Sequence, residues 1–69
     1  MSKDDDLATA EHHVRQAQSI VDRHKERVAH LEEVGADSLA ARQMLEVFED
    51  NLRIFKDHRD YLKKRREKE

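Results

Sequence analysis

The feature that most constrains this chain is the placement of its one helix-breaking residue. The 69-residue sequence contains a single glycine, Gly35, and no proline. Glycine and proline interrupt helices more strongly than any other residues. Because the interruption falls almost at mid-chain, the sequence has room for two long helices and one turn. We therefore predict an all-α fold, a coiled-coil-like antiparallel two-helix hairpin.

The residues before Gly35 follow a seven-residue repeat of apolar positions. Two positions of the repeat form a seam along one side of the predicted helix. One position holds Leu7, Val14, Val21 and Val28, and the other holds Ala10, Ala17, His24 and Leu31. Such a repeat predicts a helix with one apolar side, over about residues 5–34. Asp4, Asp5 and Asp6 lie where the helix dipole favours negative charge, and we expect one of them to cap the helix.

Gly35 is expected to take the left-handed conformation that ends a helix, with Asp37 or Ser38 capping the next one. The turn then covers about residues 34–37, and so short a connection returns the second helix, about residues 38–66, alongside the first. The seam of the second helix has Leu45, Leu52 and, out of pattern, Arg59 on one position, and Ala41, Phe48, Phe55 and Leu62 on the other. Residues 1–69 are thus expected to form a single hairpin domain.

A second apolar row lies on the flank of the second predicted helix. Val47, Ile54 and Tyr61 recur every seven residues, and Met44 lies between this row and the seam. One neighbouring helix cannot cover so wide an apolar face. A chain of this size also seldom stabilises a lone core, and without cysteine it has no disulfide to help. We therefore predict a homo-oligomer, with a dimer that forms a four-helix bundle favoured and an unidentified protein partner as the alternative. The predicted docking residues are Met44, Val47, Phe48, Ile54, Phe55 and Tyr61.

The five histidines do not have the spacing of a metal site. No two lie three or four residues apart, and the sequence contains no Glu-x-x-His. We expect no metal and no cofactor. His24 is distinctive because it occupies a seam position. It is either a tolerated polar residue that fixes the register of the helices or a pH-sensitive position, since imidazole titrates near neutral pH.

Charged residues make up 43% of the chain, with 14 basic against 16 acidic side chains, and the two signs are interspersed. The exception is the basic run Lys63, Lys64, Arg65 and Arg66. Cations are favoured at the carboxyl end of a helix, and an antiparallel hairpin would place the run beside Asp4 to Asp6. The alternative is an anion-binding patch for nucleic acid or an anionic surface. No aromatic or glycine pattern of a nucleic-acid module accompanies the run, so we do not expect nucleic acid as the partner.

Neither an enzyme nor a membrane protein is predicted. The sequence has no nucleophile in a recognisable context and no glycine-rich phosphate loop. The polar, acidic residues Met1 to Asp6 are unlike a secretory signal, and no apolar run approaches the ~20 residues of a membrane span. A cytoplasmic protein is the expectation.

Two segments carry a resemblance to known sequences. Ala10 to Arg15 reads A-E-H-H-V-R, and Leu45 to Leu62 reads L-E-V-F-E-D-N-L-R-I-F-K-D-H-R-D-Y-L. The chain resembles, over nearly its whole length, small hypothetical proteins common in alphaproteobacteria. This resemblance implies a helical hairpin in a bacterial cytoplasm and no activity or site residue. The sequence thus favours a non-enzymatic structural or protein–protein interaction module, and the alternative is a small nucleic-acid or anionic-surface binder.

Overall fold

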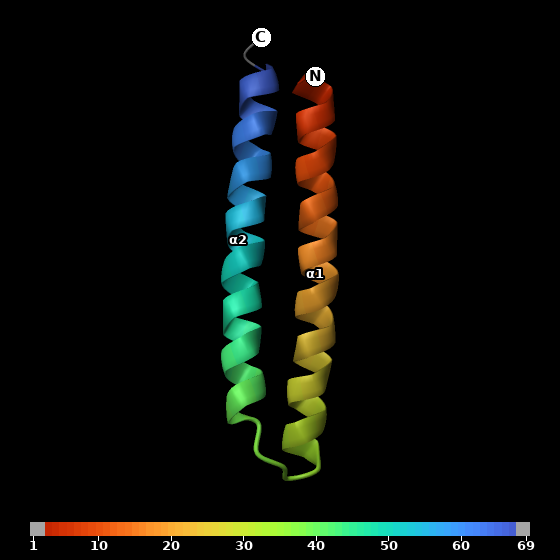
Figure 1. Cartoon of the computed structure of the whole chain (residues 1–69), viewed down its shortest axis with the longest axis vertical. Coiled ribbons are helices and arrows are strands. Elements are labelled where there is room, and N and C mark those ends of the chain that lie inside the picture. The colour runs from red at the N-terminus through yellow and green to blue at the C-terminus, as the bar shows by residue number, and fades with distance from the viewer. Residues whose placement is uncertain (1–2, 68–69) are drawn as a thin grey trace.

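The protein is a hairpin of two long helices packed side by side. The structure, a computed structural model, describes residues 3–67, with side chains from Asp5 onward. Helix α1 spans Lys3–Glu33 and helix α2 spans Leu39–Glu67, and the two run in opposite directions (Figure 1). The molecule measures 53 × 15 × 14 Å. No strand occurs within residues 3–67, so the predicted all-α hairpin is confirmed.

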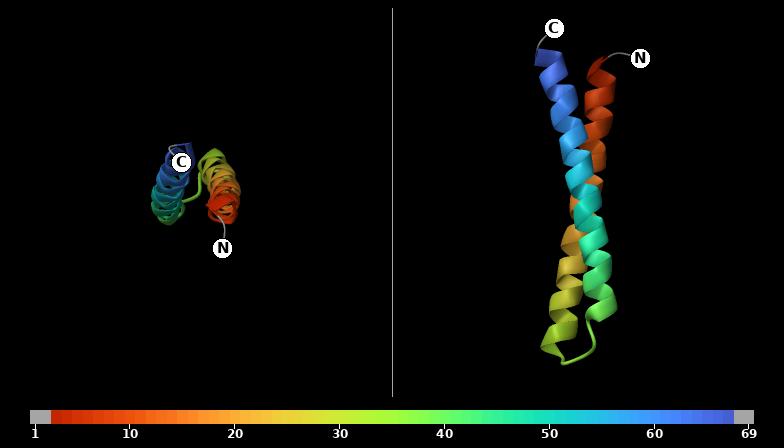
Figure 2. Two further views of the ribbon diagram at one scale, coloured as in Figure 1. Left: turned by 90° about the horizontal axis from the view of Figure 1, so that it is seen from above. Right: turned by 90° about the vertical axis from the view of Figure 1, so that its left-hand side faces the viewer.

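The core is a narrow seam along α1, built by the seven-residue repeat. The buried apolar residues of α1 are Leu7, Ala10, Val14, Ala17, Val21 and Val28. Val21, near the middle of the helix, is the most deeply buried, with 1% of its surface exposed. Figure 2 shows that the helices cross at a shallow tilt, and Figure 1 shows them side by side along their length. The repeat keeps its apolar positions turned toward the neighbouring helix because seven residues are close to two helical turns.

Helix α2 faces this seam with larger side chains that are less completely covered. Leu52 is its one buried apolar residue, and it joins Val14, Ala17 and Val21 in a cluster on which Leu45 and Phe48 pack. Valines and alanines are short, so one helix of them cannot enclose a row of leucines and phenylalanines. Phe55 shows the consequence: it was expected in the seam, but 37% of its surface is exposed.

Helix α1 ends in a Schellman turn at Gly35. This residue has φ +73°, the left-handed conformation that the sequence predicted for it. The amide of Ala36 donates to the carbonyl of Leu31 at 2.9 Å, and the amide of Gly35 donates to that of Glu32 at 3.2 Å. These two bonds satisfy carbonyls that the end of a helix would otherwise leave unpaired.

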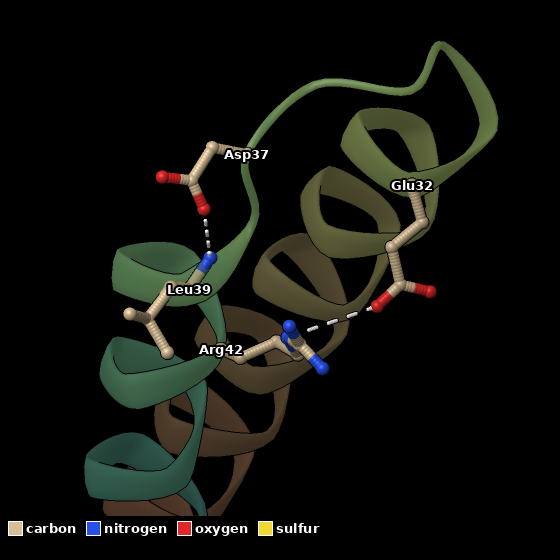
Figure 3. A network of polar contacts seen from close by, with 4 residues as sticks. All are labelled: Glu32, Asp37, Leu39 and Arg42. Atoms are coloured by element: carbon tan, nitrogen blue, oxygen red, sulfur yellow. Dashed lines mark hydrogen bonds and ion pairs between the residues drawn. The ribbon is translucent and has the colours of Figure 1, made fainter.

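Helix α2 begins with a side-chain cap from Asp37. Its Oδ1 accepts a hydrogen bond from the amide of Leu39 at 3.0 Å (Figure 3). The amide of Arg42 donates to the carbonyl of Ser38 at 2.8 Å. Of the two capping residues predicted, Asp37 thus provides the side-chain oxygen, while Ser38 is buried. Arg42 also approaches Glu32 across the hairpin, at 3.9 Å. Both side chains of this ion pair are more than half exposed, so it adds little stability.

The start of α1 differs from the sequence-based expectation. The helix already includes Lys3, two residues before the expected start. Asp5 and Asp6 therefore lie inside its first turns, so the prediction that one of them is the cap is wrong, and the side chain of Asp4 is outside the described residues. The helix dipole explains the result, because acidic residues are favoured throughout the first turn of a helix as well as at its cap.

Candidate functional site

One side of the hairpin is hollowed between the helices at mid-length. The hollow has a volume of about 250 Å³ and a mainly apolar surface. Its lining comes from both helices: His13, Gln16, Ala17, Ile20, Phe48, Asn51 and Phe55. The hollow exists because Ala17 is too small to fill the space between the two phenylalanines of α2.

Two histidines of α1 pack on these phenylalanines. The rings of His24 and Phe48 stack, with centroids 4.6 Å apart and planes inclined by 26°. His13 meets Phe55 with centroids 5.5 Å apart and planes at 44°. Offset and tilted arrangements at these separations are favourable for aromatic rings. The imidazole of His24 thus covers one face of Phe48, and His13 meets Phe55 at a tilt, while both imidazoles still border open solvent.

The second apolar row of α2 borders the same hollow. Asn51, in the hollow's lining, lies four residues after Val47 and three before Ile54, which puts all three on one strip of the helix. Val47, Ile54 and Tyr61 are exposed over 55%, 61% and 60% of their surface. The prediction that α1 leaves this row uncovered is confirmed.

We call this surface the apolar side face. It comprises Ile20 of α1 and Met44, Val47, Phe48, Ile54, Phe55 and Tyr61 of α2, flanked by His13 and His24. A second hollow of about 310 Å³, lined by Met44, Ala41 and Leu31 among others, extends the face toward the turn. Large apolar side chains that gather on one exposed side of a protein mark an interaction site.

The opposite side of the hairpin is polar. A shallow depression there is lined mainly by charged and amide side chains: Gln18, Lys25, Glu49, Arg53, Lys56, Asp57, Arg59 and Asp60 among them. Arg53 pairs with Asp50 at 3.3 Å, and Arg59 with its neighbour Asp60 at 3.0 Å. The contrast between the two sides marks the apolar side face as the surface that gains most from being covered.

The structure brings the six predicted docking residues onto this face and adds one from α1. Ile20 is half-buried in the lining of the central hollow, and the seven-residue seam did not include it. The signal for it was its place seven residues after His13, on a row next to the seam. His24 is half-buried in the lining of the second hollow, so it is not enclosed in the core as its seam position suggested.

The basic run at the end of α2 has acidic neighbours. Arg65 and Arg66 line a small depression together with Asp6 and Leu62, across the hairpin. This is the proximity that antiparallel pairing predicts between the basic run and the aspartates. Lys63 and Lys64 are exposed. Carboxylates beside the run lower the positive potential that it presents to an anion.

Among the residues that the structure describes, no three His, Asp or Glu side chains group as metal ligands. Over the same part of the chain, neither helix has an apolar stretch long enough to cross a bilayer. Comparison with protein-family models, with curated proteins and with solved structures gives no significant match to this chain. The resemblance to alphaproteobacterial hairpin proteins therefore stays a prediction.

Proposed function

We propose that the protein is a non-enzymatic interaction module that pairs with a second copy of itself through the apolar side face. The observation that carries this proposal is the exposed row Val47, Ile54 and Tyr61 beside an apolar hollow. Two hairpins that bury these faces against each other form a four-helix bundle, a common way for short hairpins to complete a core.

The size of the face supports a second copy as its occupant. The apolar side face runs from Met44 to Tyr61, about 26 Å along α2, and a second hairpin, 53 Å long, is long enough to cover it. The thin seam of α1 supports it further, because valines and alanines contribute less burial than the leucines and phenylalanines of α2. A closed two-fold dimer is the commonest form of soluble oligomer.

Sedimentation equilibrium over a range of protein concentrations tests this proposal. The expected species at micromolar concentration is a dimer of the 8.2 kDa chain. Its thermal midpoint should rise with protein concentration, because folding and association are coupled. A fully helical monomer throughout the range would overturn self-association, and the face would then be open to a different protein.

Two substitutions on neighbouring residues sharpen the test. Ile54→Glu places a charge in the apolar row and should shift the protein toward monomer. Arg53→Gln changes the net charge by the same amount but lies in the polar depression on the other side of α2, so the dimer should persist. Equal behaviour of the two variants would show that the row does not form the contact.

A further inference from the structure

Two hairpins related by a two-fold axis can face each other in two ways. If their turns lie at opposite ends, α2 packs against α2 of the second copy. If their turns lie at the same end, α2 packs against α1 of the second copy. The proposed function requires only that the faces meet, and the choice between the two arrangements rests on how residues are distributed along each helix.

The rows of apolar residues favour contact between the two α2 helices. On α2 the outer row at seven-residue spacing is Val47, Ile54 and Tyr61, which is apolar or aromatic throughout. The row of α1 that borders the same hollow is His13, Ile20, Arg27 and Val34. Same-end pairing would press the apolar row against histidine and arginine, whereas opposite-end pairing places apolar against apolar. Opposite-end pairing leaves the α1 rows to face each other, so polar side chains meet polar side chains and Arg27 is not pressed against the apolar row.

The charges of α2 favour the same arrangement. The first half of α2, residues 39–53, has two arginines and three acidic residues, Glu46, Glu49 and Asp50. The second half, residues 54–67, has six lysines and arginines and only three acidic residues. With the turns at opposite ends the two basic halves lie at opposite poles of the dimer, whereas turns at the same end would gather both at one pole, where like charges repel.

We propose, on the basis of the proposed function, that the dimer is antiparallel, with its two-fold axis at Ile54. This residue is the centre of the apolar row and lies one position from residue 53, the midpoint of α2. An axis there overlaps the hairpins over their full length. It places Ile54 against Ile54, and Val47 of each copy against Tyr61 of the other, a small side chain opposite a large one.

Cysteine crosslinking tests this register directly, because the native sequence has no cysteine. Under mild oxidation, Ile54→Cys should give a covalent dimer. Val47→Cys alone should not, because the two copies of residue 47 lie fourteen residues apart across the axis, about 21 Å along the helices. A disulfide needs Cα atoms within about 7 Å. Tyr61→Cys alone should fail for the same reason, while an equal mixture of the Val47→Cys and Tyr61→Cys proteins should crosslink.

The outcomes separate this inference from the proposed function. A dimer in which neither Ile54→Cys alone nor the mixture of Val47→Cys and Tyr61→Cys crosslinks would mean that α2 packs against α1 of the second copy. A dimer with no Ile54→Cys crosslink would refute the register. Absence of any dimer would refute the proposed function itself.

A spin label at Ala36→Cys in the exposed turn gives a second measurement that leaves the face intact. The antiparallel dimer predicts a label-to-label distance close to the 53 Å length of the hairpin. Labels within a short distance of each other would overturn the antiparallel arrangement.

Discussion

The imidazole of His24 on α1 stacks on the ring of Phe48 on α2, with centroids 4.6 Å apart. With His13 on Phe55, this contact places two titratable rings on the apolar side face. The hollow beside His24 is also lined by Arg27 of α1 and Asp37 of the turn. No other titratable side chain lines the central hollow beside His13. Covering the face would therefore move both imidazoles from the edge of solvent into an apolar interface.

This placement predicts that the dimer weakens in mild acid. The apolar interface favours neutral imidazoles, so the dimer binds fewer protons than two separate monomers. Association should then be strongest at alkaline pH and weaken in mild acid, because a charged imidazole is unfavourable inside an apolar interface. Sedimentation at several pH values measures the effect, with circular dichroism to show that each hairpin stays helical.

The other histidines provide a matched control for this pH effect. The double substitution His13→Gln and His24→Gln should flatten the pH dependence of association. His12→Gln with His30→Gln removes two exposed imidazoles that line neither hollow of the face and should leave the pH dependence unchanged. His58, which neighbours Ile54 on α2, is retained in both proteins. If the two double variants respond alike, the histidines on the face do not control pairing.

Substitution of Gly35 should destabilise the hairpin through the backbone alone. A Cβ built at this residue meets no atom within 4 Å, so crowding contributes nothing. A residue with a Cβ at φ +73° loses about 1 kcal/mol. Gly35→Val should therefore lower the free energy of unfolding, and Gly35→Asn should lower it less, because asparagine tolerates this region. Urea denaturation compares the two, and equal losses would contradict a purely conformational cost.

The seam predicts unequal effects for two leucines of α2. Leu52 is 7% exposed and packs on Val14 and Val21, so Leu52→Ala should cost about 2–4 kcal/mol in unfolding free energy. Leu39, at the start of the same helix, is 56% exposed, and Leu39→Ala should stay within about 0.5 kcal/mol. Similar losses at the two positions in chemical denaturation would mean that the seam is not the main source of stability.

The basic run is expected to contribute little binding to nucleic acid. Because Asp6 lies beside Arg65 and Arg66, a labelled DNA duplex should show no saturable binding at micromolar protein in ~150 mM salt. Fluorescence anisotropy measures this. Tight binding that weakens steeply with salt, and is lost when Lys63 and Lys64 are replaced by alanine, would favour the anionic-surface alternative.

Much of the fold could be predicted from the sequence because it depends on local rules. Gly35 is the one residue that readily adopts a left-handed backbone, and the structure places φ +73° there. The repeat of Val14, Val21 and Val28 marks the buried side of α1 by helix geometry alone, and all three are buried.

What the sequence could not supply was the depth of burial across the hairpin. That depth depends on how side chains of different size meet, and no repeat records it. Phe55 holds a seam position yet stays partly exposed because Ala17 opposite is small, and His24 is half-buried over Phe48 for a similar reason. Ile20 was missed because its row on α1 is otherwise largely polar.

Both ends of the described chain, at Lys3 and Glu67, lie at the end of the hairpin opposite Gly35 (Figure 1). In an antiparallel dimer, the ends of one copy therefore emerge at one pole and those of the other copy at the far pole. The rod between them has the 53 Å length of a single hairpin. The proposed dimer would hold any two bodies fused to the chain ends of its two copies apart at a fixed spacing.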